Sequence, residues 1–70
     1  MTLHGAGFYG TSFGPFVRVE LPGGAQVESP LVVLHDEGTV EAALPEGARG
    51  ACRIVVENPD GRVATFLAVL

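Results

Sequence analysis

The chain is poor in the residues that usually hold very small proteins together. Among its 70 residues there is one cysteine, Cys52, and no tryptophan. One cysteine cannot form an internal disulfide, and together with His4 and His35 it falls short of the usual ligand set of a structural zinc site. We therefore expect neither a disulfide framework nor a metal, and the sequence predicts no cofactor.

Positive charge is also scarce. The basic side chains are four arginines against eight acidic residues, which gives a formal net charge of −4. Nucleic acids and anionic membrane surfaces are bound by clustered basic residues, and this chain has no such cluster. It also lacks an apolar run of about 18 residues that could cross a bilayer as a helix. We therefore expect neither nucleic acid nor a membrane as the partner.

Charged residues make up only 17% of the chain, whereas hydrophobic residues make up 47%. A soluble domain typically has about 25% charged residues. A chain of this size hides only about 60% of its unfolded surface, so its core is slight and is commonly supplemented by oligomerisation or docking. The composition predicts that a protein partner, either another copy or a larger assembly, covers part of the apolar surface.

Short β-branched segments separated by glycine and proline predict an all-β fold. Val17, Val19 and Leu21 alternate with polar residues, which is typical of a half-buried strand. Pro45 would end any helix in the segment before it, so we favour a strand over a short helix there. Further strands are expected at residues 26–29, 31–35, 39–44, 52–57 and 62–70, with 31–35 buried on both faces and 62–70 lying along the core.

Turn signals separate these segments at short intervals. Pro22-Gly23-Gly24 tolerates positive φ, and Asn58-Pro59-Asp60-Gly61 has the residue order of a type I turn. About seven short strands with such spacing predict a β-sandwich or a small barrel.

Three segments resemble the immunoglobulin-like domains of plexins and certain transcription factors, known as IPT or TIG domains. Leu3 to Phe8 is similar to the family's strand ending in Gly-x-Gly-Phe. Residues 40–50 are similar to its strand, proline and glycine-loop element, and residues 52–61 to its strand entering an Asn-Pro-Asp-Gly hairpin. The resemblance implies one domain over residues 1–70, an immunoglobulin-like β-sandwich of about seven short strands.

One departure from the family matters for function. IPT domains usually begin with a further strand before the segment that matches Met1 to Phe8, and that strand is missing here. Its absence implies an open sheet edge, which in folded proteins is covered, blunted or used for pairing with another chain.

Four of the five aromatic residues lie between the first two expected strands. We expect Phe8 and Phe16 to plug the end of the core. Tyr9 and Phe13 lie in a glycine-rich loop, where a large aromatic side chain suits an interface anchor. Tyr9, Phe13 and Phe16 are the candidate partner-binding residues.

Counting strands up and down the sandwich predicts that the loops at residues 5–15 and 45–50 share one end and form one contact surface. The opposite end would collect Asp36, Glu37 and Asp60. Their spacing matches no calcium-binding loop, so we interpret them as solvated turn residues rather than metal ligands.

No residue pattern predicts catalysis. Cys52 alternates with apolar residues and is expected to be a core side chain, and Ser12 and Ser29 lack the context of a nucleophile elbow. His4 and His35 are expected at a strand end and a turn entry. The sequence predicts no catalytic residues and no enzyme.

The sequence thus favours a non-catalytic interaction or structural module. Our first hypothesis is an accessory or decoration subunit of a larger assembly, such as the capsid or tail of a phage virion, made in the cytoplasm if Met1 is the natural start. The alternative is an excised accessory domain of a secreted or cell-surface protein that binds carbohydrate or a partner, although a carbohydrate site would want more exposed aromatics. A dimerising module of a transcription factor would want a basic surface.

Overall fold

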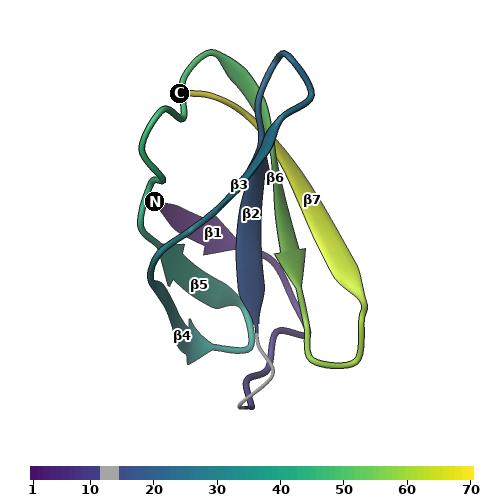
Figure 1. Ribbon diagram of the computed structural model, residues 1–70. Helices are drawn as coiled ribbons and strands as arrows, with labels where there is room; N and C mark the ends of the chain where they lie inside the picture. Colours follow the sequence, from purple (N-terminus) through teal and green to yellow (C-terminus); the bar gives the residue numbers. More distant parts are fainter. Residues whose placement is uncertain (12–14) are drawn as a thin grey trace.

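Seven β-strands make up the regular structure of the chain, for which a computed structural model describes residues 1–11 and 15–70 (Figure 1). None of the described residues forms a helix, so none could cross a membrane as one. Residues 39–44 contain the expected strand and no helix. In chain order the strands are β1 (Thr2–His4), β2 (Phe16–Glu20), β3 (Gln26–Glu28), β4 (Val32–Asp36), β5 (Thr39–Ala42), β6 (Ala51–Glu57) and β7 (Val63–Val69).

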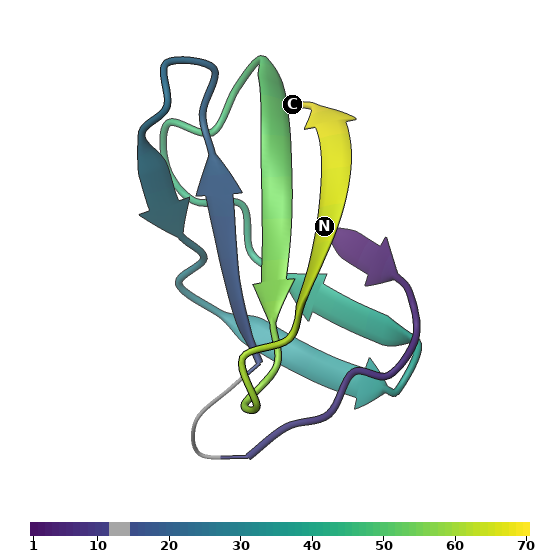
Figure 2. The ribbon, with the colours of Figure 1, turned by 90° about the vertical axis from the view of Figure 1, so that its right-hand side faces the viewer.

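The strands form two antiparallel sheets that face each other. The smaller sheet has the order β1-β5-β4, and the larger has the order β3-β2-β6-β7. Figure 2 shows that the strands of the smaller sheet run across those of the larger one. The predicted all-β sandwich is confirmed. Its strand order is that of an immunoglobulin sheet pair, except that no described strand occupies the place beside β1 where that fold has its first strand.

The core lies between the two sheets. Its largest fully buried side chains sit at alternate positions on three strands, which places them on one face of each strand. Phe8 reaches this core from the loop after β1, and Cys52 is buried in it, as predicted for both. The even-numbered residues from Ala64 to Leu70 are partly buried against the same cluster. The five largest fully buried side chains are Val17, Val19, Val40, Ile54 and Val56.

Turn geometry follows the predicted signals. The Gly61 N–H donates to the Asn58 carbonyl at 2.9 Å, which closes the turn between β6 and β7. The loop after β1 needs a glycine for a different reason. A Cβ added at Gly5 would lie 2.7 Å from Cζ of Phe8, so the missing side chain lets Phe8 enter the core.

The expectation that residues 31–35 are buried on both faces is wrong. Val33 is exposed, and Val32 and Leu34 are only partly buried. The strand β4 lies at the edge of the smaller sheet, and the sandwich has only two layers, so one face of β4 remains in solvent.

The predicted grouping of the loops is also wrong. The Gly5 N–H donates to the Gly38 carbonyl at 2.9 Å, and Asn58 Nδ2 donates to the Gly7 carbonyl at 3.0 Å. The loop after β1 therefore lies with the β4–β5 and β6–β7 turns. The 45–50 loop lies at the other end, where a Cβ at Gly50 would be 3.2 Å from the ring of Pro22.

A sheet switch explains this error. Figure 1 shows the chain passing from β3 in the larger sheet to β4 in the smaller one while continuing in the same general direction. Strand counting assumes a reversal at every connection, and Pro30 marks a crossing between sheets instead. The link is fixed by Ser29, whose hydroxyl donates to the Ala43 carbonyl at 2.6 Å.

Candidate protein-contact surface

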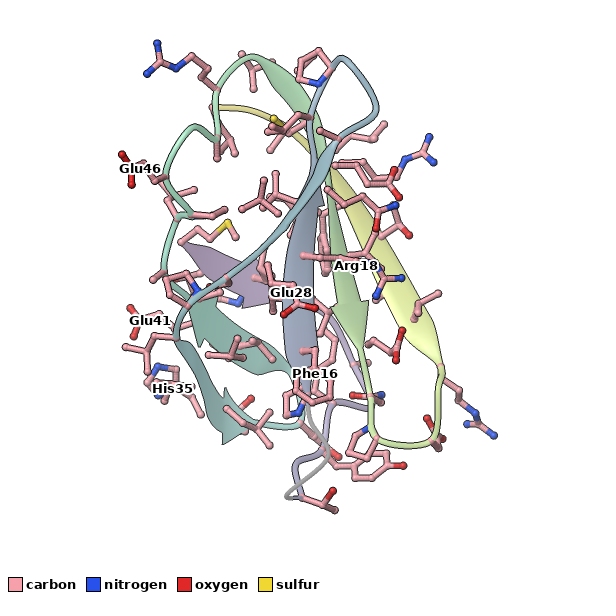
Figure 3. The ribbon with its side chains drawn as sticks, in the orientation of Figure 1. Phe16, Arg18, Glu28, His35, Glu41 and Glu46 are labelled. Atoms are coloured by element: carbon pink, nitrogen blue, oxygen red, sulfur yellow. The ribbon has the colours of Figure 1, made fainter. Side chains whose placement is uncertain are left out.

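The predicted partner-binding aromatics have different positions in the structure. Phe16 is 51% exposed, so the expectation that it plugs the core is wrong. Side chains alternate along β2, so Phe16 points to the face opposite the buried Val17 and Val19, which is the outer face (Figure 3). Tyr9 is 40% exposed, and its N–H donates to Asn58 Oδ1 at 3.5 Å. Phe13 lies outside the described residues, and partner binding by the three aromatics stays a prediction.

Among the described residues, the most exposed large hydrophobic side chains belong to β7, which the sequence analysis did not single out. Leu67 is 81% exposed and Val69 is 84% exposed. Strand alternation places them with Val63 and Thr65 on the outer face of the larger sheet, while Phe66 and its even-numbered neighbours face the core. The signal was present in the sequence, because both faces of this segment are apolar where a half-buried strand would alternate with polar residues.

The other half of the same face, over β2 and β6, carries two ion pairs beside the exposed Phe16. Arg18 Nη1 lies 3.0 Å from Glu57 Oε1, and Arg53 Nη1 lies 3.8 Å from Glu20 Oε2. These pairs join β2 to β6 across the larger sheet. In Figure 3, Arg18 lies on the side of the molecule away from the smaller sheet. Val55, which shares the outer face of β6, is nevertheless buried. Apart from Phe16, the exposed large hydrophobic side chains of this face that the structure describes therefore lie on β7.

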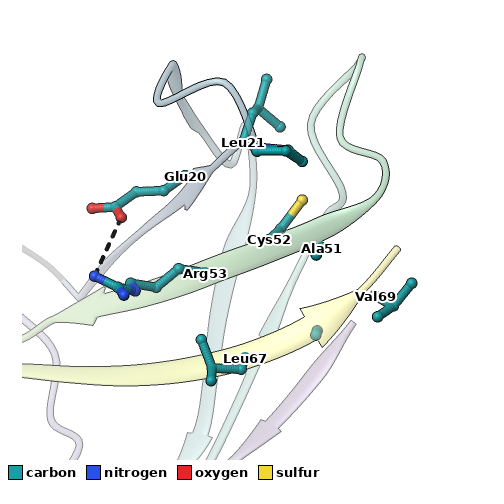
Figure 4. A pocket seen from close by; sticks show the side chains of 9 residues that line it. Glu20, Leu21, Ala51, Cys52, Arg53, Leu67 and Val69 are labelled. Carbon is teal, nitrogen blue, oxygen red and sulfur yellow. Dashed lines mark ion pairs between the residues drawn. The ribbon is translucent and has the colours of Figure 1, made fainter.

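An open groove of about 520 Å³ crosses the ends of β2, β6 and β7 (Figure 4). The Glu20–Arg53 ion pair lies on one side of it, and Leu67 and Val69 lie on the strand at the other side. Its two charged side chains are thus paired with each other rather than converging on a ligand. The lining residues are Glu20, Leu21, Pro22, Ala51, Cys52, Arg53, Leu67, Ala68 and Val69.

The outer edge of β7 has no neighbouring strand among residues 1–11 and 15–70. Gly50 and Leu70 exchange two hydrogen bonds of 2.8 Å, which makes them a hydrogen-bonded pair of the β6–β7 ladder. Because such pairs alternate along antiparallel strands, the even-numbered residues of β7 bond to β6. The N–H and C=O groups of Val63, Thr65, Leu67 and Val69 point away from it. No strand in the described part of the chain pairs with that edge.

The other three sheet edges differ from this one. The strands β1 and β3 have three residues each, and β3 exposes the charged Glu28. The register of β4 is irregular between Leu34 and Asp36, which breaks its pairing surface. Short length, charge and irregular register all protect an edge from pairing with other chains. The seven-residue strand β7 has none of these features. We call its free edge and the outward side chains of Val63, Thr65, Leu67 and Val69 the β7 surface.

The remaining polar candidates are engaged in local contacts. Asp36 Oδ1 accepts a hydrogen bond from the Gly38 N–H at 2.8 Å, and Asp60 Oδ1 accepts one from the Arg62 N–H at 3.0 Å. His35 Nε2 lies 3.2 Å from Glu41 Oε1. His4 ends β1 and is exposed. Residues 1–11 and 15–70 contain no group of three or more histidine, cysteine or acidic side chains that could hold a metal.

No protein-family model, curated protein or solved structure matches this chain. The resemblance to IPT domains therefore stays a prediction.

Proposed function

We propose that the chain is a non-catalytic module that works by protein–protein contact and that the β7 surface is its contact site. The single observation that carries the proposal is the coincidence of a long strand edge that no described strand pairs with and the two most exposed large hydrophobic side chains of the described residues, Leu67 and Val69. Either feature alone is common on monomeric proteins. Together on one strand they match the way extended segments are recognised, by backbone hydrogen bonds and alternate side chains.

Physical chemistry favours covering this surface. Full burial of a leucine or valine side chain stabilises by about 1.5–3 kcal/mol, and folding of the monomer captures little of that for Leu67 and Val69. An uncharged edge strand is also a template for indiscriminate pairing, which natural proteins normally prevent. A specific partner that adds a strand beside β7 removes both problems.

The groove supports a contact role better than a catalytic one. A catalytic or small-ligand pocket encloses its ligand and aims several polar groups at one point. This groove is open, and its charged side chains, Glu20 and Arg53, form an ion pair with each other. More specifically, we propose that the protein is a building unit of a larger assembly, such as an accessory subunit of a virion.

Site-specific photo-crosslinking tests the proposal. A photo-reactive side chain replaces Leu67 in one variant and Leu31 in a control, because Leu31 is also a strongly exposed leucine but lies beside β4 on the other sheet. In the cells that naturally make the protein, we expect a discrete adduct from position 67 that disappears when Val69→Lys is added. Mass spectrometry of the adduct identifies the crosslinked peptide. Equal adducts from both positions, or none from position 67, would show that the β7 surface is not a contact site.

A further inference from the structure

We propose that the occupant of the β7 surface is a second copy of this chain. The two β7 strands pair antiparallel about a two-fold axis and join the four-stranded sheets of both copies into one continuous sheet of eight strands. This inference rests on the proposed function and adds the identity and geometry of the partner.

The backbone pattern of β7 fits itself. Its free N–H and C=O groups belong to every second residue, which is the spacing that an antiparallel neighbour requires. One register pairs all seven residues of both strands. In that register Val63 lies opposite Val69 of the second copy, and Thr65 lies opposite Leu67 of the second copy. The two copies of Phe66 lie opposite each other, one on either side of the two-fold axis. All four outward-facing residues of each copy then make hydrogen-bonded pairs.

Charge also permits self-pairing at this edge. Residues 63–70 carry no charged side chain, so two identical strands bring no like charges together. The nearest cation along the chain, Arg62, is held 3.4 Å from Asp60 Oδ2 in its own turn. Two copies of an acidic chain repel each other over most of their surfaces. The β7 strand carries no charge, so the repulsion is weakest where two β7 strands meet.

The side chains of the same register extend one apolar surface. On the outer face, Val63 lies beside Val69 of the second copy and Leu67 beside Thr65 of the second copy, which covers part of the surface that Leu67 and Val69 now expose to water. A partner strand with charged side chains at these positions would bury charge against them. A second β7 supplies apolar side chains and one threonine at every outward position.

The size of the contact sets its strength. A standard interface buries about 800 Å² per partner, which is a large share of the 4321 Å² surface of this chain. One strand edge and its outward side chains cover less than that. We therefore expect a reversible dimer with a Kd of about 10–100 μM.

A matched pair of proline substitutions tests the pairing. Thr65→Pro removes an N–H that points to the free edge of β7 and leaves the bonds to β6 intact. Thr2→Pro does the same at the free edge of β1, because Met1 and Ala42 form the neighbouring hydrogen-bonded pair. Sedimentation equilibrium follows the mass of each variant from about 5 μM to about 1 mM, a range that brackets the expected Kd.

We expect the wild-type chain and Thr2→Pro to approach twice the monomer mass together. Thr65→Pro should keep its β circular dichroism spectrum and show a Kd raised at least about tenfold, which moves its rise in mass to correspondingly higher concentration. If Thr65→Pro does not fold, Leu67→Lys replaces it, with Leu31→Lys as its control. Loss of the dimer in Thr2→Pro but not in the β7 variants would move the interface to β1 and overturn the proposal.

Cysteine crosslinking tests the register. Ala64 and Ala68 of the second copy form a non-hydrogen-bonded pair, in which the Cα atoms are about 4.5 Å apart, within disulfide range. The background is Cys52→Ala, because Cys52 lies opposite Ala68 on β6. A mixture of Ala64→Cys and Ala68→Cys chains should form a mixed disulfide dimer under mild oxidation. Neither variant should form one alone, and equal yields from a single variant would contradict the register.

The two proposals fail in different ways. A wild-type chain that remains monomeric at about 1 mM overturns self-pairing. If position 67 then crosslinks to a different protein, the contact function stands with another occupant. If position 67 crosslinks to nothing, both proposals fail.

Discussion

Leu67 offers the sharpest separation between folding and association, because it is 81% exposed in the monomer. Full burial of a leucine stabilises by about 1.5–3 kcal/mol, so the buried fifth of this side chain contributes about 0.3–0.6 kcal/mol to folding. Lysine also favours strands less than leucine does, and this difference lowers the free energy of unfolding by at most about 1 kcal/mol. We therefore predict that Leu67→Lys lowers the free energy of unfolding by no more than about 1.6 kcal/mol.

The same substitution should strongly weaken association. Lysine would place a positive charge opposite Thr65 of the second copy and remove an apolar side chain from the contact, and edge lysines are a natural device against strand pairing. Urea unfolding at low protein concentration measures the folding effect, and sedimentation at high concentration measures the association effect. Leu31→Lys, at 62% exposure in the starting side chain, is the control that should change neither quantity much.

A large effect of Leu67→Lys on folding would be inconsistent with a solvent-exposed Leu67. If Leu67→Lys lowers the free energy of unfolding by more than about 2 kcal/mol, the side chain must belong to the core of the monomer. The β7 surface would then not be free to bind a partner.

Other substitutions test the fold that presents the surface. Ile54→Ala removes a fully buried side chain and should cost about 2–5 kcal/mol, against a total stability of about 3–10 kcal/mol for a chain of this length, so chemical denaturation should show a large unfolded fraction. Gly5→Ala places a methyl group 2.7 Å from Phe8 Cζ and should lower the melting temperature, whereas Gly23→Ala, with no heavy atom within 4 Å of its added Cβ, should not. Arg18→Ala breaks the partly exposed pair with Glu57 and should cost less than about 1 kcal/mol, an effect that added salt should reduce.

Local patterns in the sequence were sufficient to predict the strands. Val17 and Val19 alternate with polar residues on β2, and Asn58 to Gly61 carry the turn order that the structure confirms. Such signals depend on neighbours along the chain, so one sequence contains them. The burial of Phe8 and Cys52 followed from the same alternation and from the glycines around Phe8.

Predicting the contact surface requires information about the whole fold that local sequence patterns lack. The switch of sheets at Pro30 decides which loops meet, and strand counting cannot detect it. The parity of Phe16 on β2 decides that its side chain faces solvent. The exposure of Leu67 and Val69 follows from the edge position of β7, which is a property of the whole sheet order. The sequence did contain a signal for this surface. Three of the four outward positions of β7 are apolar, and Thr65 is the exception.

Residue-resolved amide hydrogen exchange shows whether the edge of β7 is open in the monomer and covered on association. In dilute protein the amides of Thr65, Leu67 and Val69 should exchange rapidly, while those of Ala64, Phe66 and Ala68, bonded to β6, should exchange slowly. On association the three odd-numbered amides should become protected, and the amides of β1 and β3 at the other edges should not change. Protection of Thr65, Leu67 and Val69 in the dilute monomer, or their continued rapid exchange in the assembled state, would contradict the account.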